Sequence, residues 1–172
     1  ITLALITFSC AKKIPYSKEI ETKYGITEKS LGGLQFYLVN DIILVSDDNQ
    51  SNNNSTDLDE DGHIIVKEEL NTDRIVIKAG TRGIFEEKKE GNNIAVSFEA
   101  GDGRNLTFGA STVRGRYIIQ AKEWKPNGSG IVDYANKQYT LSRNSSGAYI
   151  TVKLRKTKQL NNSSRIAKGR KI

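Results

Sequence analysis

The chain is poor in several residue types, and each shortage excludes a class of site. Its 172 residues include 1 Cys, 1 Trp, 1 His, 2 Pro and no Met. The single Cys excludes an internal disulfide and any zinc or iron–sulfur site built from several Cys side chains. The single His, His63, argues against a multi-His metal site and a Ser-His-Asp triad. No apolar run approaches the roughly 20 residues with which a helix spans a bilayer.

The positive charge of the chain is concentrated near its C-terminus. The formal net charge is +6, and segment 157–172 has no apolar face, so we expect that segment to be disordered. Such a tail can bind phosphate-rich partners, including nucleic acid and anionic lipid, but a solubilising terminus is the commoner role of a charge run. From residue 153 onward the chain has no acidic residue and these basic ones: Lys153, Arg155, Lys156, Lys158, Arg165, Lys168, Arg170 and Lys171.

The first nine residues predict an export signal. Residues 1–9 are almost all apolar or small, and their number suits the hydrophobic region of a secretory signal peptide. Cys10 follows directly, which resembles a bacterial lipoprotein signal, in which this Cys becomes the lipidated N-terminus. Thr7 and Phe8 depart from that pattern, because such signals usually have Leu and a small residue there. The alternative is a first strand that buries Cys10 as a small hydrophobic side chain.

The lipoprotein interpretation divides the chain into four parts. Residues 1–9 would be the remnant of the signal peptide, and Cys10 would carry the lipid. Residues 10–24 would form a tether between membrane and domain, 25–156 the β-domain, and 157–172 the basic tail.

Two short helices are predicted ahead of the strands. Ser17 is a suitable N-cap for a helix over 18–24, and Gly25 is a suitable stop. Thr27 and Gly32 frame a second helix over 28–31 in the same way.

After Leu34 the apolar residues recur with a period of two. Ile94, Val96 and Phe98 alternate with smaller or polar residues, as do Ile150 and Val152, which indicates strands with one buried face. Short strands separated by turns, without long helices, predict an all-β fold: a single antiparallel β-barrel or sandwich of about eight to nine strands. The predicted strands are 34–46, 63–70, 74–78, 83–87, 92–99, 105–110, 116–125 and 131–142, with 148–156 as a ninth.

Several strand-like segments together form a recognisable pattern: YGIT at 24–27, LQFYL at 34–38, DIIL at 41–44, IKAGTRG at 77–83, VSFE at 96–99, LTF at 106–108 and GIVDY at 130–134, followed by Tyr139. These segments resemble small all-β lipoproteins of Bacteroidota-type cell envelopes. The resemblance implies an outer-membrane lipoprotein with a β-domain, and it implies no catalytic residue. In related envelopes an acidic stretch after the lipidated Cys is associated with surface export; here Lys12 and Lys13 occupy that place, which favours the periplasmic face.

The sharpest chemical pattern is a calcium loop, D-x-D-x-D-G-x5-E, over residues 57–68. Gly62 would permit the sharp turn, and the last carboxylate would close the cage as a bidentate ligand. The metal ligands would be Asp57, Asp59, Asp61, His63 through its carbonyl, and Glu68.

The flanks of this loop favour a different interpretation. Residues 47–56 are polar and loop-like, and Ile64, Ile65 and Val66 favour a strand rather than the helix of a calcium-binding hand. A long solvated hairpin with its turn at Asp61 and Gly62 explains the same residues without a metal.

Three functional hypotheses follow. The first is a non-enzymatic, lipid-anchored envelope protein that binds or supports another envelope component. The second is a ligand-binding module for calcium, through loop 57–68, or for glycan, through the strand aromatics Trp124, Tyr134 and Tyr139, although such aromatics more often pack in the core. The third, an enzyme, ranks last because no carboxylate pair can be placed on facing strands. A nucleic-acid partner is disfavoured, because the strands lack interleaved basic and aromatic residues.

Overall fold

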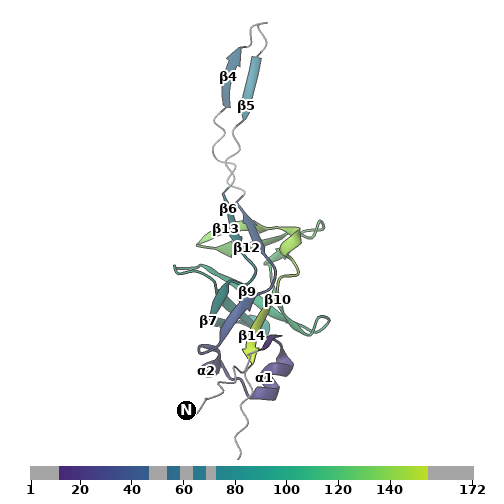
Figure 1. The fold of residues 1–172 in the computed structure, drawn as a ribbon. Coiled ribbons are helices and arrows are strands. Elements are labelled where there is room, and N and C mark those ends of the chain that lie inside the picture. The colour runs from purple at the N-terminus through teal and green to yellow at the C-terminus, as the bar shows by residue number, and fades with distance from the viewer. Residues whose placement is uncertain (1–11, 47–53, 59–63, 69–72, 155–172) are drawn as a thin grey trace, which may run out of the picture.

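The structure is a computed structural model that describes residues 12–46, 54–58, 64–68 and 73–154. Two antiparallel sheets form most of it, as the sequence predicted, and they form a sandwich rather than a closed barrel (Figure 1). The large sheet contains, in spatial order, β1 (Lys12–Pro15), β14 (Ile150–Leu154), β2 (Gln35–Leu38), β7 (Arg82–Lys89), β8 (Asn93–Ser97), β9 (Asn105–Ser111) and β10 (Arg116–Ile119).

The small sheet faces the large one across a shared core. It contains, in spatial order, β11 (Glu123–Trp124), β12 (Gly130–Tyr134), β13 (Lys137–Leu141), β3 (Ile42–Val45) and β6 (Arg74–Ile77). A separate pair, β4 (Asn54–Leu58) and β5 (Ile64–Glu68), forms a hairpin that projects from the end of the sandwich opposite the helices (Figure 1).

The large sheet curls until its last strand approaches its second. A single antiparallel bridge joins Ile118 of β10 to Tyr149, just before β14. Beside it, Ile119 N donates to Ala148 O across 2.8 Å. The core lies inside this curl and against the small sheet. Its largest fully buried side chains are Tyr16, Tyr117, Tyr134, Phe36, Phe108, Leu38, Ile42, Leu44, Ile94, Leu106, Ile119 and Leu141.

The structure has more strands than predicted, because two predicted strands change sheets, a third is a hairpin, and β1 and β4 were not predicted. Segment 34–46 splits into β2 and β3, and 116–125 splits into β10 and β11, one strand of each pair in each sheet. Segment 131–142 is the hairpin β12–β13, whose turn residues Ala135 and Asn136 have φ of 50° and 61°. Such a turn requires positive φ at both central positions.

A polar corner turns the chain between β2 and β3. Asp41 Oδ1 accepts a hydrogen bond from Ala79 N at 2.7 Å, and Ser145 Oγ lies 3.0 Å from both Asp41 O and Ile43 N. The hydrogen bond from Ala79 N, with Lys78 beside it, lowers the pKa of the Asp41 carboxyl. These contacts redirect the chain into the second sheet. Phe36 and Leu38 before the corner and Ile42 and Leu44 after it stay in phase on a two-residue period, which the exposed Asn40 interrupts.

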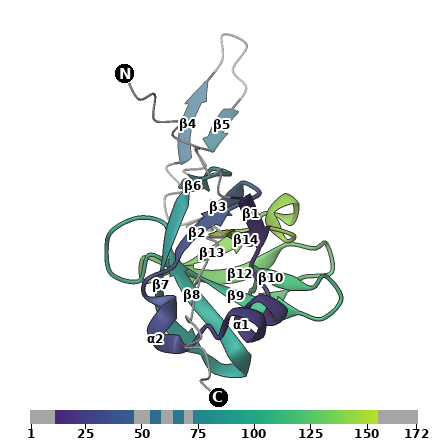
Figure 2. The same ribbon diagram turned by 60° about the horizontal axis from the view of Figure 1, so that its bottom comes forward.

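Both predicted helices are present, α1 (Lys18–Tyr24) and α2 (Glu28–Leu31), side by side at one end of the sandwich (Figure 2). Ile20 N donates to Ser17 Oγ at the start of α1. Gly25, with φ of 60°, ends it in the left-handed conformation that favours glycine. No described helix has the length and apolar character needed to cross a membrane.

Residues 12–24, which we expected to be part of a tether, lie in the sandwich instead. β1 pairs with β14 over its whole length, and Tyr16 is fully buried between them and α1. The Tyr16 ring packs on Phe36 and Tyr117, with ring centroids 5.1 and 4.9 Å apart. The strand was missed because residues 12–16 contain few apolar side chains, and only Ile14 and Tyr16 of these pack in or against the core.

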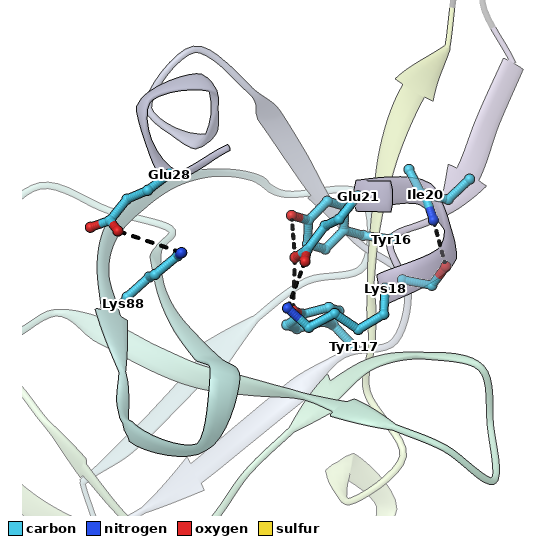
Figure 3. A network of polar contacts seen from close by, with 8 residues as sticks. Tyr16, Lys18, Ile20, Glu21, Glu28, Lys88 and Tyr117 are labelled. Carbon is cyan, nitrogen blue, oxygen red and sulfur yellow. Dashed lines mark hydrogen bonds and ion pairs between the residues drawn. The ribbon is translucent and has the colours of Figure 1, made fainter. Parts of the chain in front are cut away.

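One carboxylate fastens α1 to the large sheet (Figure 3). Glu21 Oε1 accepts hydrogen bonds from Tyr16 Oη at 2.7 Å and from Tyr117 Oη at 2.8 Å. Its second oxygen accepts from Lys18 Nζ at 2.6 Å. α2 is joined to β7 by the ion pair between Glu28 and Lys88, 3.4 Å apart.

Candidate functional site

The candidate site lies where the chain crosses from β10 of the large sheet to β11 of the small one. At the crossing, Gln120 N donates to Thr107 O of β9, and Lys122 N donates to Ile131 O of β12, each at 2.8 Å. The connecting segment is therefore hydrogen-bonded first to the large sheet and then to the small one. It forms a wall between the two sheets at this point.

Two adjoining hollows open beside this wall, with volumes of about 480 and 790 Å³. Both are lined by Lys89, Asn105 and Asp133, so they adjoin, and we call the two together the inter-sheet groove. The first hollow is also lined by Glu90, Asn93, Leu106, Thr107, Gln120, Ala121, Lys122 and Val132, and the second by Glu87, Gly103, Asn136, Lys137 and Gln138.

The charges that line the groove sum to zero, because Lys89, Lys122 and Lys137 balance Glu87, Glu90 and Asp133. Lys89 pairs with Glu87, and Lys122 pairs with Asp133. All four of these side chains are between two-fifths and two-thirds exposed, so each pair contributes little to stability. The groove therefore presents oppositely charged pairs to a ligand, not a field of one sign.

Between the charged pairs the lining is rich in carboxamides: Asn93, Asn105, Gln120, Asn136 and Gln138. Each carboxamide carries two N–H donors and an acceptor oxygen. The side-chain amide of Gln120 donates one hydrogen bond to Ile118 O at 3.2 Å.

Gly109 on β9 allows two of these amides to approach the sheet. A Cβ at Gly109 would lie 2.4 Å from Asn93 Oδ1 and 2.9 Å from Gln120 Cγ. No side chain fits in that space unless both amides move.

The single tryptophan lines neither hollow, but it lies beside Gly130 together with Ala121, which lines the first one. Trp124 is 42% exposed and its ring lies over Gly130, where a Cβ would come within 3.0 Å of Trp124 Cε3 and 2.6 Å of Ala121 Cβ. Ala121 and Val132 both line the first hollow. Val132 is two residues from Gly130, on the same face of the strand. An exposed aromatic face therefore adjoins the amide-lined space.

The two other aromatics considered for a glycan face pack in the core. Tyr134 and Tyr139 are buried, with ring centroids 6.3 Å apart in an edge-to-face arrangement. Burial, and then the hydrogen bond donated to Glu99 Oε1 at 2.7 Å, raise the pKa of Tyr134. Of the three aromatics, only Trp124 offers a ring surface to a ligand.

The structure describes the backbone of two of the proposed calcium ligands. Asp57 lies on β4 opposite Ile65, and Glu68 lies on β5 opposite Asn54. The two ends of the pattern are thus three residues apart along the ladder, about 10 Å at the rise of a strand. Asp59, Asp61 and His63 lie outside the described residues. Within the described ranges, no group of three or more His, Cys, Asp or Glu side chains could hold a metal ion.

The antiparallel pairing of β4 with β5 agrees with the hairpin interpretation of this segment. Residues 54–56, which we expected to belong to a loop, are part of β4. Cys10 and the basic tail 157–172 lie outside the described residues.

Sequence reasoning missed the inter-sheet groove, because its residues come from five strands, β7, β8, β9, β12 and β13, and from the segments that connect them. Three glycines gave the only local signal, since Gly103, Gly109 and Gly130 each leave space for a neighbouring side chain at the groove. Comparisons of the chain with protein-family models, curated proteins and solved structures find no match. The function is therefore argued from the geometry.

Proposed function

We propose that this chain is a non-enzymatic, lipid-anchored envelope domain that binds a neutral, hydroxyl-rich envelope component, a glycan, in the inter-sheet groove. One observation carries the proposal: a carboxamide-lined groove with internally paired charges adjoins the exposed ring of Trp124. Cys10 would hold the domain at the membrane, on its periplasmic face, through its lipid.

The chemistry of the lining favours hydroxyl groups over ions. A hydroxyl both donates and accepts a hydrogen bond, and the side chains of Asn93, Asn105 and Gln120 do the same. An anion would compete with Glu87 and Asp133 for Lys89 and Lys122, which already have these partners. The apolar face of Trp124 suits the C–H face of a sugar ring, since an aromatic ring buries a large area with few rotatable bonds.

The position of Trp124 makes the proposal directly measurable. It is the one Trp of the chain, so its fluorescence reports the environment beside the groove. We expect neutral oligosaccharides of increasing length to shift the emission to shorter wavelength in a saturable manner. An acidic oligosaccharide of the same length should bind more weakly.

A matched pair of variants separates the groove from the rest of the surface. Asn105→Ala removes an amide shared by both hollows and should weaken binding about five- to tenfold, the value of one hydrogen bond. Asn40→Ala removes an exposed amide that lines neither hollow and should leave the affinity unchanged. Equal affinities for the two variants would reject the groove as the binding site.

A further inference from the structure

Two lysines stand directly opposite each other at the edge of the large sheet. Lys13 of β1 and Lys153 of β14 are ladder partners. Their ammonium groups lie over one ring, that of Tyr37, at 4.4 and 5.1 Å from its centroid. Arg82 is the ladder partner of Tyr37 on the next strand and is also exposed.

This arrangement gathers three positive charges, although Arg82 also lines a hollow with Glu86 and Glu99. Like charges directly opposite on two strands destabilise the pair, and the cation–π contacts with Tyr37 offset that cost without removing the charge. Within the part of the chain that the structure describes, no carboxylate lies within ion-pair distance of Lys13, Lys153 or Arg82. We call these three residues the basic edge.

The chain connects the basic edge to the expected anchor. Lys13 is three residues from Cys10, so their Cα atoms are at most about 11 Å apart along an extended chain. That reach is close to the Debye length of roughly 8 Å at physiological ionic strength. Lys12, exposed beside it, pairs with Leu154, after which the basic tail begins.

We propose that the basic edge docks on the anionic phospholipid surface of the membrane that holds the domain. The inference rests on the anchoring part of the proposed function, because the lipid on Cys10 would bring Lys13 to the headgroups. The docking fixes which face of the large sheet meets the membrane and leaves the inter-sheet groove, at β9 and β12, free for its ligand. Nucleic acid offers the same phosphate chemistry, but the nearness of Cys10 favours the lipid.

The test uses the full chain with Cys10→Ser, so that no lipid contributes to binding. Sedimentation is measured with vesicles of equal parts phosphatidylglycerol and phosphatidylcholine, and with phosphatidylcholine alone. One Lys near an anionic surface contributes about fivefold to partitioning, so Lys13→Gln with Lys153→Gln should weaken binding about 30-fold. Lys13→Arg with Lys153→Arg should retain it, which shows that a loss in the Gln variant reflects charge rather than misfolding.

Two further pairs control for charge elsewhere. Arg74→Gln with Lys125→Gln removes the same charge from the small sheet and should leave binding unchanged. Lys168→Gln with Lys171→Gln removes it from the tail and should cost less than the change at the basic edge. The proposal is overturned if all three pairs weaken binding equally, if only the tail pair does, or if neutral vesicles bind as well. Tighter binding to a DNA duplex, lost in the same Gln variant, would also overturn it in favour of nucleic acid.

These outcomes are distinct from a failure of anchoring. A native chain without lipid on Cys10 would remove the anchor, yet the lipid-free protein would still show whether the basic edge binds anionic vesicles.

Discussion

The phenol of Tyr117 donates a hydrogen bond across 2.8 Å to Glu21, a residue 96 positions earlier in the chain. Tyr16 donates to the same oxygen of Glu21 from the other side (Figure 3). One carboxylate on α1 thus connects the start of the described chain to β10, near the opposite edge of the large sheet.

Glu21→Gln should destabilise the fold. The neutral amide loses the ion pair with Lys18 and accepts more weakly from two buried phenols, whose bonds to a charged group contribute about 1–3 kcal/mol. Urea unfolding followed by circular dichroism measures the change. Glu123→Gln, at an exposed position on β11, should stay within about 0.5 kcal/mol of the parent. Equal midpoints for both variants would contradict the role given to Glu21.

The same cluster predicts a loss of stability at high pH. Burial raises the pKa of Tyr117 to about 12, despite the opposing effect of Lys18, and burial also raises the pKa of Tyr16. A raised pKa in the folded state means that the stabilisation is complete below pH of about 10, the unfolded value, and is lost as the pH rises through 12. Tyr117→Phe removes this titration, so its unfolding free energy should fall less between pH 9 and 12.

At low pH the pKa shift of Glu21 has the opposite sign to those of the two tyrosines. Burial alone would raise the pKa of its carboxyl, but the hydrogen bonds from Lys18, Tyr16 and Tyr117 lower it below the usual value. The resulting stabilisation is present above the unfolded pKa of about 4.3 and is lost as the pH falls through the folded value. In Glu21→Gln, the free energy of unfolding should therefore decrease less as the pH falls through this range.

Removing the segment 12–24 should cost far more than removing the residues before it. A chain that begins at residue 25 lacks β1 and the fully buried Tyr16, and loss of one large buried aromatic side chain alone costs about 3–5 kcal/mol. A chain that begins at residue 12 keeps both. Urea midpoints distinguish them, and equal midpoints would show that the segment is a tether after all.

Calcium should leave the melting temperature unchanged. The ladder sets Asp57 and Glu68 three residues out of register, which suits a hairpin better than a cage closed on one ion. A ligand that binds only the folded state raises stability by RT ln(1 + [L]/Kd), so a millimolar site would be visible in a thermal melt. A calcium-dependent rise that Glu68→Gln abolishes would establish the metal site instead.

Cys10→Ser should release the protein from membranes. A lipid chain contributes about 0.8 kcal/mol per buried methylene, and several chains hold a protein firmly where one does not. Membrane fractionation measures the release, and the intact mass of the parent should include the lipid. A Cys10→Ser protein that still sediments at high salt, where the basic edge is screened, would reject the anchor.

Local patterns in the sequence predicted the elements but not their assignment to sheets. Ser17 and Gly25 marked α1 correctly because capping depends on neighbouring residues alone. The two-residue period marked most strands, but it resumes in the same phase after the exposed Asn40, so segment 34–46 was predicted as one strand. Contacts of Asp41 with Ala79 and Ser145 redirect the chain there. Those partners are distant in sequence, so no local pattern shows the change of sheet.

The same limit applies to the candidate site. Trp124 was noticed as a ligand-facing aromatic, but Asn93, Asn105 and Gln120 are unremarkable in the sequence. They become a site only because Gln120 bonds to β9 while Lys122 bonds to β12. Tyr134 and Tyr139 are aromatic, as the residues of a sugar-binding face are. Only the packing between the sheets shows that they are buried.

The position of β14 between β1 and β2 has a consequence for biosynthesis. A ribosome releases residues 12–15 and 35–38 long before residues 150–154, which must enter between them. Until then both strands have an unpaired edge, and Phe36 and Leu38 lack their neighbours from β14. Pairings of such long sequence separation form slowly, and exposed strand edges promote aggregation. A chaperone that covers the open edge of β2 would therefore shield the incomplete sheet until β14 has been synthesised.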